Sequence, residues 1–155
     1  MPNATAPAPA LVRKAASPDL PAVERIEREQ FPNPWSREYY AAELENTLSH
    51  FYVAEGADGV VAGYLLFWRL GAELELHKLA VAGERQQRGY ASALLDFFLG
   101  SGRRWGCERA VLEVRASNLP AIRLYEKFAF GCVGRRRDYY DRPVEDALLF
   151  EVRFR

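Results

Sequence analysis

The sequence predicts a single α/β domain, with antiparallel strands early in the chain and a crossover helix in the middle. Two observations support this fold class. Short apolar runs typical of strands are interspersed with segments of helical periodicity, and turn residues separate them. The 155 residues suffice for one core, and 49% of them are apolar, which excludes disorder of the whole chain.

The first half of the chain is predicted to hold one strand, two helices and three further strands. Residues 1–10 are small, Pro-rich and uncharged, so we expect a flexible tail there and one domain over residues 11–155. Ser17 as a cap and Pro18 at the first helical position predict the first helix. Ser36 is the expected cap of the second helix. The predicted segments are, in order, a strand near 11–12, helices over 17–30 and 36–46, and strands over 51–55, 60–70 and 73–81.

The second half is predicted to alternate helices with strands and to close with an antiparallel pair. A polar, glycine-containing stretch over residues 82–91 leads into a helix whose apolar stripe includes Leu94, Leu95 and Phe98. The last two apolar runs are interpreted as neighbouring strands. The predicted segments are, in order, a helix over 92–104, a strand over 109–115, a helix over 119–128 and strands over 130–137 and 147–154.

Charge and cysteine content exclude several classes of protein. Lys and Arg together number 21, as do Asp and Glu, and this balance argues against a general nucleic-acid binder. Cys107 and Cys132 form neither a metal motif nor a disulfide framework, and we expect both to be small buried apolar residues. The chain starts without the features of a signal peptide, and no apolar run reaches the length of a membrane span. We therefore expect a cytoplasmic protein without membrane or direct nucleic-acid partners. A monomer or weak dimer is the expected oligomeric state, which these observations do not determine.

The sharpest motif is Gln86–Ala91 (QQRGYA), between a predicted strand and a predicted helix. The N-terminus of a helix presents unpaired N–H groups and partial positive charge, and a glycine lets the backbone approach a ligand closely. Together with Arg85 and Arg88, these features make an anion site suited to a pyrophosphate. The motif lacks the Gly-Lys-Ser/Thr of a P-loop. By this pattern alone, an ordinary strand–helix turn is an equally good interpretation.

With these residues and several others, the chain resembles the GNAT superfamily of acetyltransferases, whose acetyl-CoA motif is Gln/Arg-x-x-Gly-x-Gly/Ala. It is similar in particular to the ribosomal-protein-alanine acetyltransferase branch over roughly residues 11–155. Relative to that branch, two extra residues separate Phe31 from Trp35, and Pro120 stands where alanine is frequent. The motifs that carry the resemblance are 31–36 (FPNPWS), 77–81 (HKLAV), 112–118 (LEVRASN), 121–126 (AIRLYE), 136–140 (RRDYY) and 145–149 (EDALL).

The resemblance implies a GNAT fold, which is a mixed, mostly antiparallel sheet, splayed in its middle, with helices on both faces. It implies acetyl-CoA as co-substrate, no metal, and a protein N-terminus as acceptor, in first place the N-terminal alanine of a small-subunit ribosomal protein. Glu113 is the implied general base and Tyr125 the implied general acid. The implied cofactor-binding residues are Leu79, Ala80, Val81, Gln87, Arg88, Gly89, Tyr90, Ala91, Ser92 and Asn118, and the implied substrate-binding residues are Pro34, Trp35 and Tyr139.

The chemistry of these residue types agrees with the implied roles. An α-amino group has a pKa of about 8 against about 10.4 for lysine, so a modest base suffices for a protein N-terminus. A carboxylate can accept the amine proton directly or through one water, and a tyrosine, with an ordinary pKa of about 10, can protonate a leaving thiolate.

Other interpretations of the same residues remain open. Glu113 could simply face solvent, Tyr125 could be ordinary core, and Asn118 could only cap a helix. At the level of function, the alternatives are an acetyltransferase for small-molecule amines or protein lysines, a non-catalytic domain that binds CoA or a protein, and a nucleotide-binding module.

Overall fold

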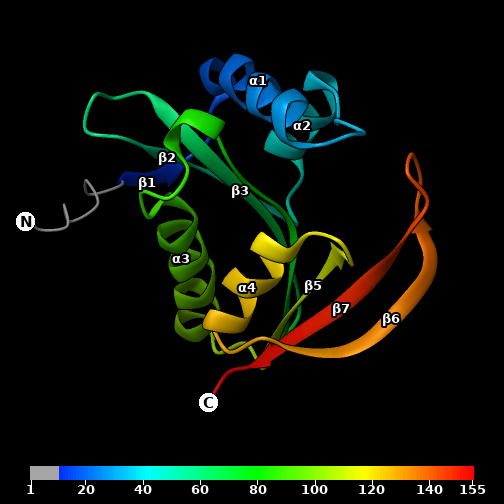
Figure 1. The fold of residues 1–155 in the computed structure, drawn as a ribbon. Helices are drawn as coiled ribbons and strands as arrows, with labels where there is room; N and C mark the ends of the chain where they lie inside the picture. The colour runs from blue at the N-terminus through cyan, green and yellow to red at the C-terminus, as the bar shows by residue number, and fades with distance from the viewer. Residues whose placement is uncertain (1–10) are drawn as a thin grey trace, which may run out of the picture. The chain divides into compact units, whose positions relative to one another are not determined.

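The computed structural model describes residues 11–155, which form a seven-stranded mixed sheet with four α-helices (Figure 1). The predicted tail over residues 1–10 lies outside the described residues. The elements are, in order, β1 (Leu11–Lys14), a 3₁₀ turn (Ser17–Asp19), α1 (Leu20–Gln30), α2 (Arg37–Glu45), β2 (Ser49–Glu55), β3 (Val61–Leu70), β4 (Glu73–Val81), a 3₁₀ turn (Gly83–Arg85), α3 (Tyr90–Arg104), β5 (Arg109–Arg115), α4 (Leu119–Lys127), β6 (Gly131–Tyr140) and β7 (Glu145–Arg153).

The strand order confirms the predicted mixed, mostly antiparallel sheet. It is β1-β2-β3-β4-β5-β7-β6, in which β4 and β5 are parallel neighbours connected through α3. β5 with β7 and β7 with β6 are antiparallel. The register of β4 with β5 ends at Leu76 and Leu112, although β4 runs on to Val81 and β5 to Arg115. Beyond Leu76 and Leu112, the backbone N–H and C=O groups of β4 and β5 are therefore not used in pairing between these two strands.

The described residues divide into two compact units. The first unit comprises residues 11–66 and 78–98, and the second comprises residues 67–77 and 99–155. In the first unit, α1 and α2 lie side by side (Figure 1). In the second unit, β6 and β7 form a long hairpin that pairs through β7 with β5. Fully buried apolar side chains of the first unit include Val23, Ile26 and Val53, and those of the second include Phe67, Leu74 and Ala110.

Local signals placed most of the elements correctly, and the differences have local causes. Ser36 caps α2 as predicted, since its hydroxyl accepts the N–H of Tyr39 at 3.1 Å. The α-helix proper of α1 begins at Leu20, because residues 17–19 form a 3₁₀ turn. The α3 helix begins two residues earlier than predicted, at Tyr90.

Two expectations about the closing hairpin were wrong. The hairpin is longer than predicted, because polar residues after Arg137 continue the ladder to the pair Tyr140–Glu145. Cys107 is buried as expected, but Cys132 is exposed. The reason is its place on β6, the edge strand of the sheet, nearly all of which is exposed.

Candidate functional site

The predicted pyrophosphate loop, residues 86–92, leads into α3 with two residues in the left-handed region. Gln87 has a φ of 62° and Gly89 a φ of 90°. The carbonyl of Gly89 accepts the N–H of Ala93 at 3.0 Å, which makes Gly89 the residue that starts the helix. The first amides of an α-helix have no partner within the helix, and left-handed turn residues orient successive N–H groups into a concave nest. This backbone is suited to bind an anion such as a pyrophosphate.

Side chains of the first unit hold this loop in place. Arg85 donates two hydrogen bonds to the carboxylate of Asp58, at 3.2 and 2.7 Å. Gln86 donates to the side chain of Gln30 at 3.0 Å and to the carbonyl of Val81 at 3.2 Å. Arg85 is thus bound to a carboxylate of its own unit, and its charge is already balanced.

The end of β4 supplies the other predicted cofactor residues of this unit. A Cβ atom at Gly63 would lie 2.6 Å from the carbonyl oxygen of Ala80, so only glycine permits this close approach of β3 to β4. The predicted cofactor residues differ in burial: Gln87, Arg88 and Gly89 are exposed, Leu79, Ala91 and Ser92 are half-buried, and Ala80, Val81 and Tyr90 are buried.

Glu113, the predicted general base, lies on β5 in the second unit with 34% of its side chain exposed. Arg136 forms an ion pair with one carboxylate oxygen at 2.9 Å, and the hydroxyl of Tyr139 lies 3.4 Å from the other. Both neighbours come from β6, where the register shifts between Arg136 and Tyr140. Asp138, with a φ of 48°, lies within this irregularity. The structure therefore brings two of the predicted site residues, Glu113 and Tyr139, together.

Tyr125, the predicted general acid, is buried on α4 with 8% of its surface exposed. Its ring packs edge-on against Phe130 at 5.7 Å between centroids. Burial, with the nearby Tyr140 hydroxyl, raises the pKa of Tyr125, which keeps the phenol protonated. Burial and the charge of Glu113 raise the pKa of Tyr140 to about 12. The charge of Glu113 thus acts on the pKa of Tyr140, and Tyr140 acts on the pKa of Tyr125, although sequence reasoning gave Tyr140 no role.

Asn118 occupies the cap position of α4, one of the alternatives that the sequence left open. Its side-chain oxygen accepts the N–H of Ala121 at 3.3 Å, which leaves the side-chain amide as the group able to donate to a ligand. The preceding loop is held by Glu145, which accepts hydrogen bonds from the N–H of Ser117 at 2.6 Å and from Arg115 at 3.2 Å.

Trp35, a predicted substrate-binding residue, is held by a buried cluster that sequence reasoning missed. Glu27 of α1 is fully buried and accepts hydrogen bonds from the Trp35 N–H at 2.9 Å and from the Lys78 ammonium at 2.9 Å. The hydroxyls of Tyr40 and Tyr64 also donate to Glu27. Pro34 is exposed beside Trp35.

A sequence signal for this cluster existed. Glu27 lies four residues after Val23 and next to Ile26, on the buried stripe of α1, where a charged residue is out of place unless it has partners.

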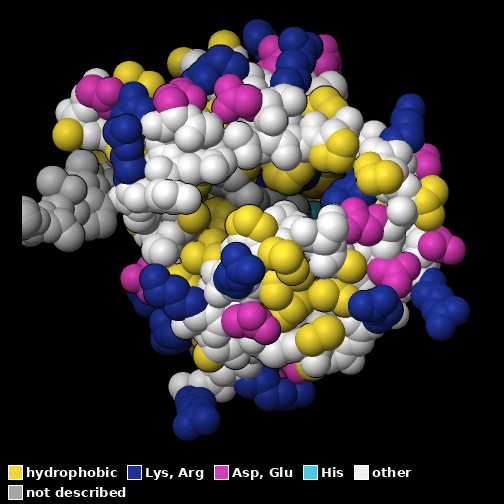
Figure 2. All heavy atoms as spheres, viewed as in Figure 1, with side chains coloured by type: hydrophobic (Ala, Val, Ile, Leu, Met, Phe, Trp, Pro, Cys, Tyr) yellow, Lys and Arg dark blue, Asp and Glu magenta, His cyan; other side chains and the backbone are white. Residues whose placement is uncertain are grey.

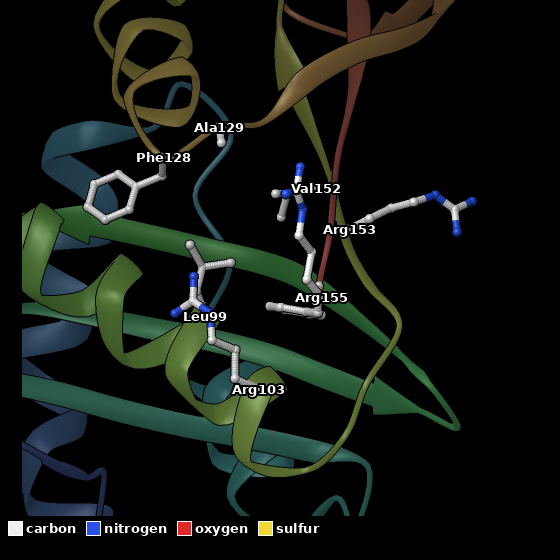
Figure 3. A pocket seen from close by; sticks show the side chains of 8 residues that line it. Leu99, Arg103, Phe128, Ala129, Val152, Arg153 and Arg155 are labelled. Atoms are coloured by element: carbon white, nitrogen blue, oxygen red, sulfur yellow. The ribbon is translucent and has the colours of Figure 1, made fainter.

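A pocket of about 510 Å³ in the second unit is a different feature (Figure 3). Leu99 and Arg103 of α3 and Phe128 after α4 line it together with residues at the end of the chain, among them Val152 and Arg153. None of the predicted site residues lines this pocket, so it is not the candidate catalytic site.

The surface carries charges of both signs. Lys and Arg side chains are interspersed with Asp and Glu side chains on the face shown in Figure 2, in keeping with the balanced composition.

Within residues 11–155, no helix has the length and apolar character needed to cross a membrane.

Comparisons with known proteins add independent findings. Residues 20–130 match the family described as the acetyltransferase (GNAT) family. The chain is 33% identical to the [ribosomal protein bS18]-alanine N-acetyltransferase of Escherichia coli, over 86% of this chain and 90% of that protein. It is 32% identical to an N-alpha-acetyltransferase of Sulfurisphaera tokodaii, over 89% of each. A crystal structure of the Escherichia coli ribosomal-protein-alanine enzyme superimposes with a TM-score of 0.85 at 28% identity, covering 93% of each chain.

Proposed function

Because the chain belongs to the acetyltransferase (GNAT) family, we propose that it transfers the acetyl group of acetyl-CoA to the α-amino group of a protein N-terminus. The first-choice acceptor is the N-terminal alanine of ribosomal protein bS18, the residue and protein named for the relatives. We place the reaction in the cytoplasm, where such an acceptor is made.

The observation that most supports catalysis is the arrangement around Glu113. Its carboxylate is partly exposed and can meet a substrate amine, while the buried phenol of Tyr125 is kept protonated. One carboxylate able to accept a proton and one phenol able to donate one meet the needs of acyl transfer between an amine and a thioester.

In the proposed reaction, acetyl-CoA supplies a thioester carbonyl and a thiolate leaving group. Glu113 accepts a proton from the attacking amine, and Arg136 gives up its ion pair with the carboxylate for this to happen. Tyr125 donates its proton to the departing sulfur as the carbon–sulfur bond breaks and the carbon–nitrogen bond forms. The side-chain amide of Asn118 is the proposed donor to CoA in the second unit.

The first unit is assigned the binding of the CoA chain. The backbone of residues 79–81 is proposed to pair with pantetheine, and the amides of residues 87–92 with pyrophosphate. The left-handed Gln87 and Gly89 at the start of α3 support this assignment. Pro34 and Trp35 of the first unit and Tyr139 of the second are each proposed to contact the peptide.

The test is acetylation of a peptide panel. Peptides that begin with Ala, the bS18 N-terminus among them, are incubated with labelled acetyl-CoA beside N-terminally blocked peptides containing lysine and beside free polyamines. We expect acetylation at the α-amine of the Ala peptides, located by mass spectrometry. Preferential labelling of lysine or of a polyamine would contradict the proposal, as would acetyl-CoA binding without any turnover.

A further inference from the structure

The buried cluster around Glu27 joins four parts of the first unit at one carboxylate. One oxygen accepts the Trp35 N–H and the Lys78 ammonium, and the other accepts the hydroxyls of Tyr40 and Tyr64. The donors thus come from β4, β3, α2 and the segment that precedes α2. A carboxylate has about four acceptor positions, so Glu27 is fully satisfied although none of it is exposed.

Lys78 also holds the segment Phe31–Trp35 through contacts of its ammonium with two aromatic rings. Its ammonium lies 3.7 Å from the ring centroid of Phe31 and 4.3 Å from that of Trp35. Only 11% of the Lys78 side chain is exposed, so these cation–π contacts are largely desolvated and correspondingly strong. The two aromatic residues at the ends of the segment 31–35 are therefore held by one ammonium group.

The composition of segment 31–35 explains why it needs such partners. Two of its five residues, Pro32 and Pro34, have no backbone N–H. The N–H of Phe31 closes α1 on the carbonyl of Glu27, and the N–H of Trp35 goes to the carboxylate of the same residue. Glu27 thus holds both ends of the segment, one through its backbone and one through its side chain.

Stability alone is a weak reason for burying this ion pair, because well-packed apolar residues of similar volume often replace such pairs without loss. A buried pair that also orders a neighbouring segment has a second use. We propose that Glu27 and Lys78 are positioning residues that hold Phe31–Trp35 in the conformation that receives the peptide N-terminus. They would thereby set the KM for the peptide and leave the chemical step alone. This inference rests on the proposed function.

The principal test is Lys78→Met, which keeps a chain of similar length and removes the charge. We expect the KM for an N-terminal peptide to rise at least ten-fold, while kcat and the Kd of acetyl-CoA stay within two-fold. Lys78→Arg keeps a cation and should recover part of the peptide affinity. The matched control is Arg109→Met, which removes a cation bound to Glu73 and Glu151 in the second unit and should leave the peptide KM unchanged.

A second readout needs no activity. In protein labelled with 5-fluorotryptophan, the ¹⁹F resonance of Trp35, assigned by Trp35→Phe, should shift or broaden in Lys78→Met. The resonances of Trp68 and Trp105, both in the second unit, should stay in place. If wild type acetylates no peptide, the proposed function fails, and this spectrum alone decides whether Lys78 orders the segment.

The double variant Glu27→Leu/Lys78→Met covers the case in which the single variant does not fold, since it leaves no unpaired buried charge. We expect it to fold and to keep the raised peptide KM. The inference is overturned if either folded variant has wild-type peptide KM and an unchanged Trp35 resonance. It is also overturned if peptide KM, kcat and acetyl-CoA affinity all worsen together in step with thermal stability, since that pattern indicates a purely structural role.

Discussion

The two units each contain a glutamate, a cation and tyrosine hydroxyls, and the two clusters differ in burial. In the first unit, Glu27 is fully buried and bonded to Lys78 and two tyrosines. In the second, the side chain of Glu113 is 34% exposed and forms an ion pair with Arg136. Breaking the bonds of a buried carboxylate whose acceptor positions are all filled costs considerable free energy. An exposed ion pair contributes little to stability and is easily broken. The same residue types therefore fix structure in the first unit, and in the second they leave a carboxylate accessible for its proposed role as proton acceptor.

The largest expected effect is the loss of activity when the exposed glutamate, Glu113, is replaced. Glu113→Gln should lower kcat/KM about 10²–10⁴-fold, because general-base catalysis contributes about that much, with acetyl-CoA binding retained. Steady-state kinetics and calorimetric titration measure the two quantities. Glu151→Gln, another ion-paired carboxylate of the second unit, is the control and should stay active. A fully active Glu113→Gln enzyme would remove this residue from catalysis.

The converse effect concerns stability. Glu27→Gln leaves the charge of Lys78 buried without its counter-ion, so unfolding free energy should fall by about 3–5 kcal/mol. Glu113→Gln changes a partly exposed side chain and should stay within about 0.5 kcal/mol of wild type. Urea denaturation followed by circular dichroism measures both. Equal losses from the two substitutions would mean that burial does not distinguish the clusters.

The tyrosines allow the same comparison. Tyr125→Phe removes the proposed proton donor and should lower kcat by about 10²-fold. Tyr40→Phe removes a buried hydroxyl bonded to Glu27 and should cost stability, about 1–3 kcal/mol, with kcat nearly unchanged. Turnover and denaturation midpoints are measured on both proteins. If Tyr125→Phe keeps full turnover, Tyr125 serves the core alone.

A third carboxylate, that of Asp19, extends the comparison to the pH dependence of stability. It is 8% exposed and accepts hydrogen bonds from Arg13 and from the Ala16 N–H, and the Arg13 bonds lower its pKa. A carboxyl whose pKa is lower in the folded protein than in the unfolded chain stabilises the fold at pH values above its ordinary pKa. This stabilisation is lost as the pH falls through the pKa of the folded state. The unfolding free energy of wild type should therefore exceed that of Asp19→Asn by about 1.5–3 kcal/mol near pH 7.

The two proteins should converge in acid, as the pH falls from the ordinary pKa of about 3.9 through the lowered pKa of folded Asp19. Urea titrations at several pH values test this. A difference in stability that is constant from neutral to acid pH would show that the charge of Asp19 is not responsible.

The smallest effect separates backbone strain from function in the first unit. Gly89 and Gly59 both have left-handed backbone, with φ of 90° and 78°. Alanine at either position should cost about 1–2 kcal/mol of stability. Only Gly89→Ala should also weaken acetyl-CoA binding, because Gly59 belongs to the β2–β3 turn. Calorimetric titration distinguishes them, and equal acetyl-CoA affinities would argue against the loop as the pyrophosphate site.

Local sequence signals predicted much of the fold and part of the candidate site. Ser36 and Asn118 cap their helices because a Ser or Asn side chain can accept a hydrogen bond from one of the first amides of the helix that follows it. The strand–glycine–helix order around Gly89 and the alternation along β5 likewise depend on neighbours a few residues away. These features need no knowledge of the rest of the chain.

Tertiary structure alone decided what surrounds each glutamate. Lys78 is 51 residues from Glu27, and Tyr139 is 26 residues from Glu113. Such partners are set by helix packing in the first unit, and by strand register and the irregularity of β6 in the second. The sequence by itself determined which side chains have the required chemistry and which local elements carry them. Burial and pairing, which make one carboxylate a fixed anchor and leave the other accessible, arise only when distant segments meet.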